Sequence, residues 1–362
     1  MRIHVNLFSK ALQCLFLTLC VSVATAQTTV PNEEMERVYN EVKTPYKYGL
    51  VVTAPTAAQM TDSPSIFRKG DKWYMYYIIF DGRGYETWMA TSDNLLDWRT
   101  EGKVMSFSAP TDWDSNQKAG YLALVDTKWG GSYKLQQYGG KYWMSYLGGN
   151  STGYEEGVLS TGMAFSHTPT VATEWQRLKN PILSPKDKDT ASWEQDKIYK
   201  SIIIQDNKKQ TGSKFVMYYN AKGKAESIGM AVSDDMTTWR RLNKQPVLDH
   251  HQGITGDAYI QKIGKVWVMF YFGFNWNQET SNKAWDSFAC SYDLINWTDW
   301  QGEPLISPSE DFDTPYAHKP WVIKYKGVVY HFYCAVDKNG KRGIAVATSK
   351  DLGKSKLEFP TE

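Results

Sequence analysis

The feature that most constrains the fold is a strand-like run of aromatic and apolar residues that recurs five times along the chain. The copies are residues 72–77, 141–146, 214–219, 265–271 and 327–333. Most copies follow a turn that contains glycine, as in residues 68–71, and a glycine turn before such a run is a signal for a β-hairpin. The chain is therefore expected to consist of repeated antiparallel strands.

A run of small residues follows each aromatic run and is typical of a further strand. These runs are residues 88–93, 162–166, 229–234, 288–293 and 343–349. In three copies a tryptophan then opens a fourth strand, at Trp98, Trp239 and Trp297. Four short antiparallel strands, repeated at roughly 50–70 residues, are typical of a propeller blade. We therefore predict an all-β fold, a five-bladed β-propeller over residues 60–355, within a catalytic domain that spans residues 56–362.

Residues 1–26 have the composition of a signal peptide. Arg2 and Lys10 form a basic start, an apolar stretch follows, and residues 24–26 have the small-x-small pattern of a cleavage site. We expect cleavage near Ala26 and a mature chain that is secreted or periplasmic. No membrane span is expected, because no segment has the roughly 20 apolar residues that a membrane helix needs.

Residues 27–55 lie outside the repeat and are expected to form a short N-terminal helical arm. Asn32 can cap a helix. Apolar residues then follow at helical spacing: Met35, Val38, Tyr39 and Val42. We expect this apolar face to pack on the propeller.

The charge balance argues against one class of function. The chain has 41 Lys plus Arg and 39 Asp plus Glu, a net charge of +2. Proteins that bind nucleic acids gain their affinity mainly from clustered basic residues, so no nucleic-acid partner is expected. The aromatic content is 14%, with 15 Trp and 23 Tyr, which favours a sheet-rich fold with aromatic binding walls.

Two cysteines lie beyond residue 26. Cys290 and Cys334 each sit in an apolar, aromatic run. Two buried thiols are therefore favoured, and one disulfide is the alternative. The chain has no CxxC spacing of the kind that binds metals, and no metal ligands are predicted.

Polar residues at the starts of the innermost strands are the first candidates for a site. In a propeller these strands surround one axis, so their starts converge on a single funnel. The candidates are Asp62 in the first blade, Lys200 in the third, Asp257 in the fourth, and His318 and Lys319 in the fifth.

At these residues the sequence resembles the five-bladed glycoside hydrolases of families 43, 117, 32 and 130. The resemblance rests on the Asp-x-Pro-x-Ile pattern of residues 62–66, the aromatic run after it, and the Met-Ala-Thr-Ser-Asp strand of residues 89–93. It covers essentially the whole mature chain. It implies a carbohydrate substrate and hydrolysis of a glycosidic bond.

The resemblance implies three catalytic residues. In the family 43 pattern Asp62 is the general base, but the fourth blade begins with Asp257 where that pattern has its acid, a glutamate. The family 117 pattern is the one we favour, and it makes His318 the candidate acid. A carboxylate such as Asp257 or Asp313 would have to keep His318 protonated near neutral pH. Asp257 is either this acidity tuner or an acceptor of hydrogen bonds from the sugar.

Conventional carboxyl acids remain an alternative. Glu86, Glu155 and Glu226 follow the second strand of their blades, and this connection opens on the same face as the funnel. An inverting hydrolase holds its acid and base roughly 6.5–9.5 Å apart, a separation that the two sides of a funnel allow.

Further residues are candidates for binding the substrate. The expected set is Glu86, Lys200, Glu226, Lys319, Trp321 and Tyr121. Lys118 and Lys197 lie near Lys200 and Lys319, and such cations suit a uronic acid or a sulfated sugar; lysines extended along blade rims are the alternative. Aromatic loop residues are candidates for stacking on sugar rings: Tyr85, Tyr121, Trp129, Tyr154, Trp276 and Trp285. The pairs at residues 113–114, 193–194 and 312–313 recur at equivalent places, which indicates a structural role.

The predicted function is that of a secreted glycoside hydrolase that cleaves O-glycosidic bonds of a polysaccharide or oligosaccharide by an inverting general acid/base mechanism. Two alternatives stay open: a non-catalytic carbohydrate-binding propeller, and a glycoside phosphorylase similar to family 130. No cofactor is required, although a structural calcium or sodium ion on the propeller axis is compatible with the fold.

Overall fold

The computed structural model describes residues 29–250, 253–275 and 283–362. In this part of the chain, twenty β-strands are accompanied by one α-helix and one 3-10 helix, so the predicted all-β class is confirmed. The predicted signal peptide, residues 1–26, lies outside the described residues. None of the helices in the described part is long and apolar enough to cross a membrane.

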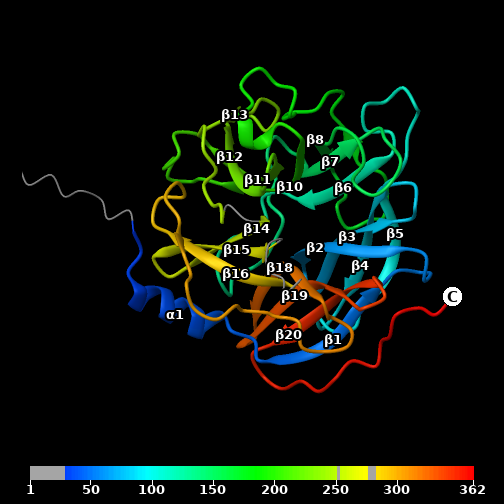
Figure 1. The fold of residues 1–362 in the computed structure, drawn as a ribbon, viewed down its shortest axis with the longest axis vertical. Helices are drawn as coiled ribbons and strands as arrows, with labels where there is room; N and C mark the ends of the chain where they lie inside the picture. The colour runs from blue at the N-terminus through cyan, green and yellow to red at the C-terminus, as the bar shows by residue number, and fades with distance from the viewer. Residues whose placement is uncertain (1–28, 251–252, 276–282) are drawn as a thin grey trace, which may run out of the picture.

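The strands are arranged in groups of four antiparallel strands, here called the first to fifth units (Figure 1). The first unit contains β2 (Met60–Lys69), β3 (Lys72–Phe80), β4 (Tyr85–Ser92) and β5 (Arg99–Met105). The second contains β6 (Gln117–Leu122), β7 (Tyr142–Gly149), β8 (Ser160–Ser166) and β9 (Gln176–Arg177). The third contains β10 (Lys197–Gln205), β11 (Phe215–Lys222), β12 (Glu226–Ser233) and β13 (Arg240–Arg241).

The fourth and fifth units complete the described strands. The fourth contains β14 (Ile254–Ile263), β15 (Val266–Phe274), β16 (Ala284–Ser291) and β17 (Thr298–Asp299). The fifth contains β18 (Tyr316–Tyr325), β19 (Val328–Val336), β20 (Arg342–Thr348) and β1 (Tyr46–Thr53). Single parallel bridges, Glu226–Ile254 and Ala284–Tyr316, join the third unit to the fourth and the fourth to the fifth.

The recurring runs of the sequence are strands, as predicted. The five aromatic runs lie in the second strands of the units, and the runs of small residues lie in the third strands. Glycine in the small-residue runs has a steric reason at Gly162, which lies opposite Tyr146. A Cβ atom on Gly162 would come within 2.2 Å of the Tyr146 ring, so only glycine leaves room for this tyrosine.

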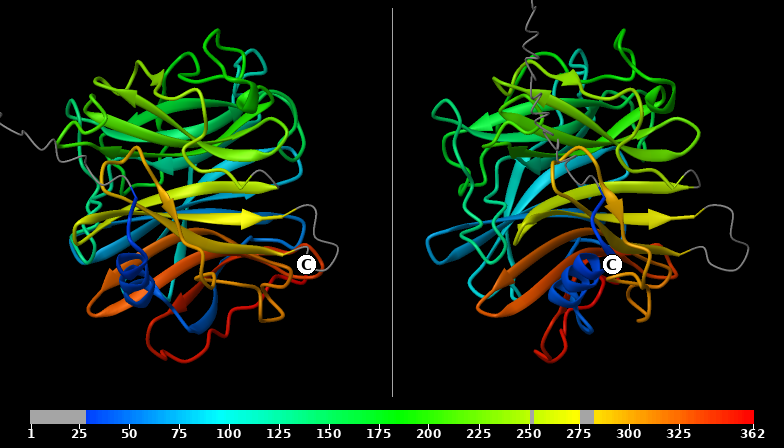
Figure 2. Two further views of the ribbon diagram at one scale, coloured as in Figure 1. Left: turned by 60° about the vertical axis from the view of Figure 1, so that its left-hand side comes forward. Right: turned by 90° about the vertical axis from the view of Figure 1, so that its left-hand side faces the viewer.

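The predicted helix is α1 (Asn32–Val42), and its buried residues are Met35, Val38 and Val42. Tyr39 stacks on Trp300 with ring centroids 5.2 Å apart, so the helix packs against the fourth unit, on the outside of the sheets (Figure 2). The expected cap was wrong by one position. Pro31 occupies the capping position, and the Asn32 side chain donates a hydrogen bond to Glu36 Oε1 at 2.8 Å.

The segment 27–55 does not lie wholly outside the repeat, which corrects the sequence-based expectation. β1 pairs with β20 in antiparallel register, from Tyr46 opposite Thr348 to Thr53 opposite Gly343. A strand near the start of the chain therefore completes the last unit. The pairing covers the edge of β20, which would otherwise expose a row of unpaired backbone groups.

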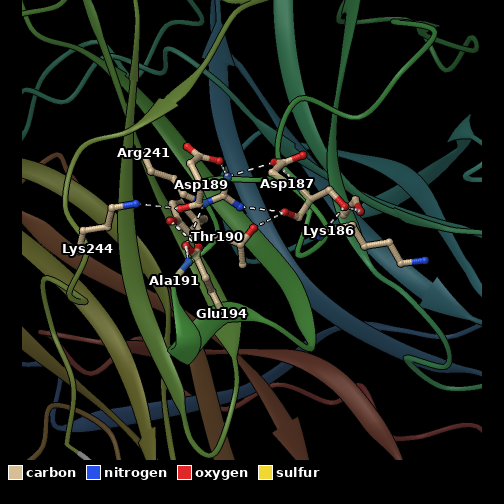
Figure 3. Close-up of polar contacts among 11 residues, drawn as sticks. Lys186, Asp187, Asp189, Thr190, Ala191, Glu194, Arg241 and Lys244 are labelled. Atoms are coloured by element: carbon tan, nitrogen blue, oxygen red, sulfur yellow. Dashed lines mark hydrogen bonds and ion pairs between the residues drawn. The ribbon is translucent and has the colours of Figure 1, made fainter.

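A buried acid holds the strands of the third unit together (Figure 3). Glu194 lies just before β10 and accepts a hydrogen bond from the Tyr219 hydroxyl of β11 at 2.8 Å. Arg241 of β13 lies 2.9 Å from the same carboxylate and donates hydrogen bonds to Asp189 at 2.8 Å and Asp187 at 3.0 Å. The first, second and fourth strands of the unit are thereby connected through one carboxylate.

The same arrangement recurs in two other units. Asp114 binds Tyr146 and Arg177 in the second unit, and Asp313 binds Tyr333 and Lys47 in the fifth. These three acids are the ones that the sequence placed at equivalent positions, and the structural role expected for them is confirmed.

Cys290 and Cys334 are buried free thiols. The favoured alternative, two separate small apolar side chains, is therefore confirmed over the disulfide. Cys334 lies in β19, where its carbonyl oxygen contacts His318.

Removal of one partner from the buried acid of the third unit should destabilise the fold. Arg241→Met leaves Glu194 buried without its cation, and we expect a loss of about 3 kcal/mol in the free energy of unfolding, measured by urea denaturation. Arg240→Met is the matched control, because Arg240 is exposed and should change stability by less than about 0.5 kcal/mol. Equal losses in the two variants would contradict this role.

Candidate active site

A cavity of about 230 Å³ lies where side chains from all five units meet. The first residue of the third strand lines it in four units: Tyr85, Glu226, Ala284 and Arg342. The innermost strands contribute Tyr121, Tyr199, Lys200, Ile254, Asp257, Tyr316, His318 and Lys319. The loop between β7 and β8 adds Tyr154 and Glu155. The expected convergence of strand starts on one hollow is thus observed for the residues of this cavity.

Register shifts in the innermost strands aim side chains into the cavity. The shifts lie between Asp62 and Ser65, Ile198 and Ser201, Gly256 and Tyr259, and His318 and Trp321. Within them, Asp257 and Lys319 have positive φ angles of 58° and 68°. Such backbone is uncommon for residues other than glycine, and bulges of this kind often redirect side chains next to active sites.

Asp62 lies behind the cavity wall. It is 2% exposed, and its Oδ2 atom accepts hydrogen bonds from Lys319 Nζ at 2.7 Å and Arg342 Nη1 at 3.1 Å. Its Oδ1 atom accepts one from the Ser63 backbone at 2.8 Å. Burial alone would raise the pKa of this carboxyl, but the charges of Lys319 and Arg342 outweigh burial and hold the pKa well below its usual range. Asp62 is therefore a permanently ionised partner of two cations.

His318 lines the cavity as a neutral imidazole. Burial, together with the charge of Lys319, lowers the pKa of His318 to about 3. A neutral ring near pH 7 donates its Nδ1 proton to the Cys334 carbonyl oxygen, 3.1 Å away, and leaves Nε2 as an acceptor. The expectation that a carboxylate keeps this histidine protonated is not met. Asp313, one of the two suggested carboxylates, is bound to Lys47 instead.

Two glutamates line the cavity and differ in their electrostatic surroundings. Burial, and then the charge of Glu155, raise the pKa of Glu226 to about 8. Burial also raises the pKa of Glu155, but Lys319 and Arg342 act against burial there and favour the charged form. Glu226 is therefore the carboxyl that keeps its proton near neutral pH.

Neighbouring side chains hold the two glutamates. Tyr85 donates a hydrogen bond to Glu155 Oε1 at 3.2 Å, and the Asn220 amide donates one to Glu226 Oε2 at 3.4 Å. Glu155 has a φ of 53°, a strained backbone for this residue type. Its carboxylate is thus set by the loop rather than by a regular strand.

The positive charges near the cavity are balanced by carboxylates. Lys319 and Arg342 bind Asp62, and Lys200 Nζ lies 3.7 Å from Asp257 Oδ2. Of the other two lysines considered from the sequence, Lys118 donates to the Ser108 hydroxyl and Lys197 to the Glu155 carbonyl oxygen, and neither lines the cavity. These contacts do not favour a uronic acid or a sulfated sugar.

The structure brings together six of the predicted site residues around the cavity: Asp257, His318, Lys200, Glu226, Lys319 and Tyr121. Two predicted substrate-binding residues are absent from its lining. Trp321 is fully buried and stacks on Tyr259 with ring centroids 4.0 Å apart. Glu86 is 2% exposed and binds Lys103 at 2.7 Å. Trp321 follows the register shift of β18, so its ring faces the core.

The aromatic loop candidates are divided in the same way. Tyr85, Tyr121 and Tyr154 line the cavity. Trp129 instead donates its ring N–H to Glu41 at 2.7 Å. Trp285 packs against Gly273, and Trp276 lies outside the described residues.

Sequence reasoning missed Arg342, Tyr199 and Asn220. Arg342 was the detectable one, because it is the first residue of its unit's third strand, the position that Glu226 occupies in the third unit. Arg342 also donates a hydrogen bond to the Tyr154 hydroxyl at 2.8 Å. Among the described residues, no group of three or more His, Cys, Asp or Glu side chains is placed to hold a metal ion.

No protein-family model matches this sequence, and no curated protein matches it either. Solved structures do match. A complex of BT0996 with RGII is 50% identical, with a TM-score of 0.89 over 92% of this sequence and 99% of that protein. A family 117 glycoside hydrolase from the marine bacterium Zobellia galactanivorans is 16% identical, with a TM-score of 0.62 over 85% of this sequence and 91% of that protein, and shows likeness of fold alone.

A third structure carries the word for the activity in its name. It is named "Glycoside hydrolase", is 49% identical, and has a TM-score of 0.89 over 92% of this sequence and 99% of that protein. Identity at this level over nearly the full length of both proteins, with two glutamates in one cavity, shows that this chain belongs to the glycoside hydrolases.

Proposed function

We propose that this glycoside hydrolase cleaves its substrate with Glu226 as general acid and Glu155 as general base. The observation that carries the proposal is the difference between their surroundings, since burial raises the pKa of Glu226 to about 8 while two cations favour the charged form of Glu155. Hydrolysis of a glycosidic bond needs one protonated and one ionised carboxyl group on either side of the bond.

The chemical step follows from these protonation states. Glu226 transfers its proton to the glycosidic oxygen as the bond from this oxygen to the anomeric carbon breaks. Glu155 takes a proton from the water whose oxygen forms the new bond to that carbon. The inverting course is the one that the resemblance to families 43 and 117 implies. Neutral His318 offers Nε2 as an acceptor for a sugar hydroxyl, and Asp62 acts by holding Lys319 and Arg342.

The five units are proposed to be the blades of a five-bladed β-propeller with the cavity at its axis. Three features support this arrangement: each unit has four antiparallel strands, all five contribute to one cavity, and Lys319 of the fifth unit binds Asp62 of the first. A calcium or sodium ion on this axis remains a prediction from the sequence.

A carbohydrate substrate is supported by the similar complex of BT0996 with RGII. We propose that this chain acts on an RGII oligosaccharide and removes its terminal sugar, because a cavity of about 230 Å³ is small beside the roughly 300–1,000 Å³ of typical ligand sites. A phosphorylase is disfavoured, since Lys319 and Arg342 are already bound to Asp62 rather than open to phosphate. Secretion is proposed from residues 1–26 alone.

Glu226→Gln should abolish proton donation to the leaving oxygen. We expect kcat for hydrolysis of an RGII oligosaccharide to fall about 10²- to 10⁴-fold, while binding measured by calorimetry changes little. Glu156→Gln is the matched control, because Glu156 is an exposed neighbour of Glu155 in the same loop. Undiminished turnover by Glu226→Gln would overturn the assignment of the acid.

The pH dependence of kcat/KM should show Glu226 on its alkaline side. Because Glu226 must be protonated to donate, activity is expected to fall as the pH rises through about 8. In Glu155→Gln, the charge that raises the pKa of Glu226 is gone, so the alkaline limb of the residual activity should move to lower pH. An alkaline limb that stays in place in this variant would contradict the coupling of the two glutamates.

A further inference from the structure

Lys200 and Asp257 form an incomplete pair at the cavity. Both line it, and they are 2% and 4% exposed. Lys200 Nζ lies 3.7 Å from Asp257 Oδ2, close enough for an ion pair but too far for a hydrogen bond. Within the described part of the chain, neither of these two atoms has a hydrogen-bond partner.

A buried charged atom without a hydrogen bond is unfavourable, so two of them in contact with one cavity indicate a ligand group. Asn220 Oδ1 lines the same cavity and is also buried without a partner among the described residues. The three atoms comprise one donor group and two acceptors. A group that both accepts and donates would complete them.

The backbone holds Asp257 in this place. Its φ of 58° is a strained conformation that lies in the register shift of β14. Gly256 before it lets the Asn220 side chain approach, because a Cβ atom there would lie 2.4 Å from Asn220 Oδ1. The strain and the close packing bring both acceptors to the same part of the cavity as Lys200.

A sugar hydroxyl has the chemistry that this pair requires. Its oxygen can accept a hydrogen bond from the Lys200 ammonium while its proton is donated to the Asp257 carboxylate. A carboxylate or sulfate group cannot donate and is repelled by Asp257, and an amino group is repelled by Lys200. The pair therefore discriminates in favour of a neutral hydroxyl.

We propose that Lys200 and Asp257 bind one hydroxyl of the sugar that is cleaved, and that this contact makes the enzyme specific for neutral sugars bearing that hydroxyl. The inference rests on the proposed function, since it names what the same cavity recognises. It makes both residues determinants of specificity rather than of proton transfer.

The test combines enzyme variants with modified substrates. The probes are an RGII oligosaccharide and derivatives in which single hydroxyls of the terminal sugar are replaced by hydrogen. For one derivative, wild-type kcat/KM should fall about 100-fold, as expected for a lost hydrogen bond to charged groups. In Lys200→Met, and in the double variant Lys200→Met/Asp257→Asn, the same derivative should fall less than about 3-fold below the parent sugar.

The double variant guards against misfolding, because it removes both buried charges together and leaves neither unpaired. Lys118→Met is the matched control: it changes another buried lysine on an innermost strand, outside the cavity lining, and should retain the full 100-fold loss. Thermal unfolding midpoints of all variants verify that they are folded.

Binding to Glu226→Gln protein, measured by calorimetry with the same probes, separates the two proposals. If the hydroxyl dependence persists in binding but wild type shows no turnover, the catalytic proposal fails and the pair is upheld. If wild type hydrolyses the oligosaccharide and every derivative loses the same factor in all variants, the proposed pair is overturned. Failure of wild type to bind any of these sugars overturns both.

Discussion

The contact of Asp62 with Lys319 and Arg342 connects the first unit to the last and underlies the arrangement of the cavity. The three charged groups come from β2, β18 and β20, and all are largely removed from solvent. Loss of one member of such a buried group leaves its partners uncompensated, which typically costs about 3–5 kcal/mol. The cations consequently have fixed positions, and every titratable group around the cavity responds to them.

The protonation states of the site follow from distance to these cations. His318 lies next to Lys319 in the chain, and burial together with that charge keeps its ring neutral. Glu155 also feels both cations, which offset part of the effect of burial. Glu226 is affected mainly by burial and by the charge of Glu155, so its pKa is raised to about 8. One ion cluster thus divides acid and base roles between two residues of the same type.

Sequence reasoning located the strands well because their signals are local. Alternating aromatic residues and glycine turns specify hairpins, and the tyrosine opposite Gly162 explains why small residues recur in the next strand. The helix face was also readable from its spacing. The place of β1 was not, since its partner strand lies about three hundred residues away and nothing local encodes the pairing. Trp321 was misassigned because a register shift, invisible in the pattern, reverses the direction of its side chain.

The chain's sequence by itself determined the all-β class, the repeated four-strand unit and the convergence of Asp257, His318 and Lys319, since each depends on local spacing repeated along the chain. Only the tertiary structure decided which of the converging groups holds a proton. That choice depends on burial and on charges contributed by other units, such as Arg342 beside Glu155, and these quantities exist only after the chain has folded.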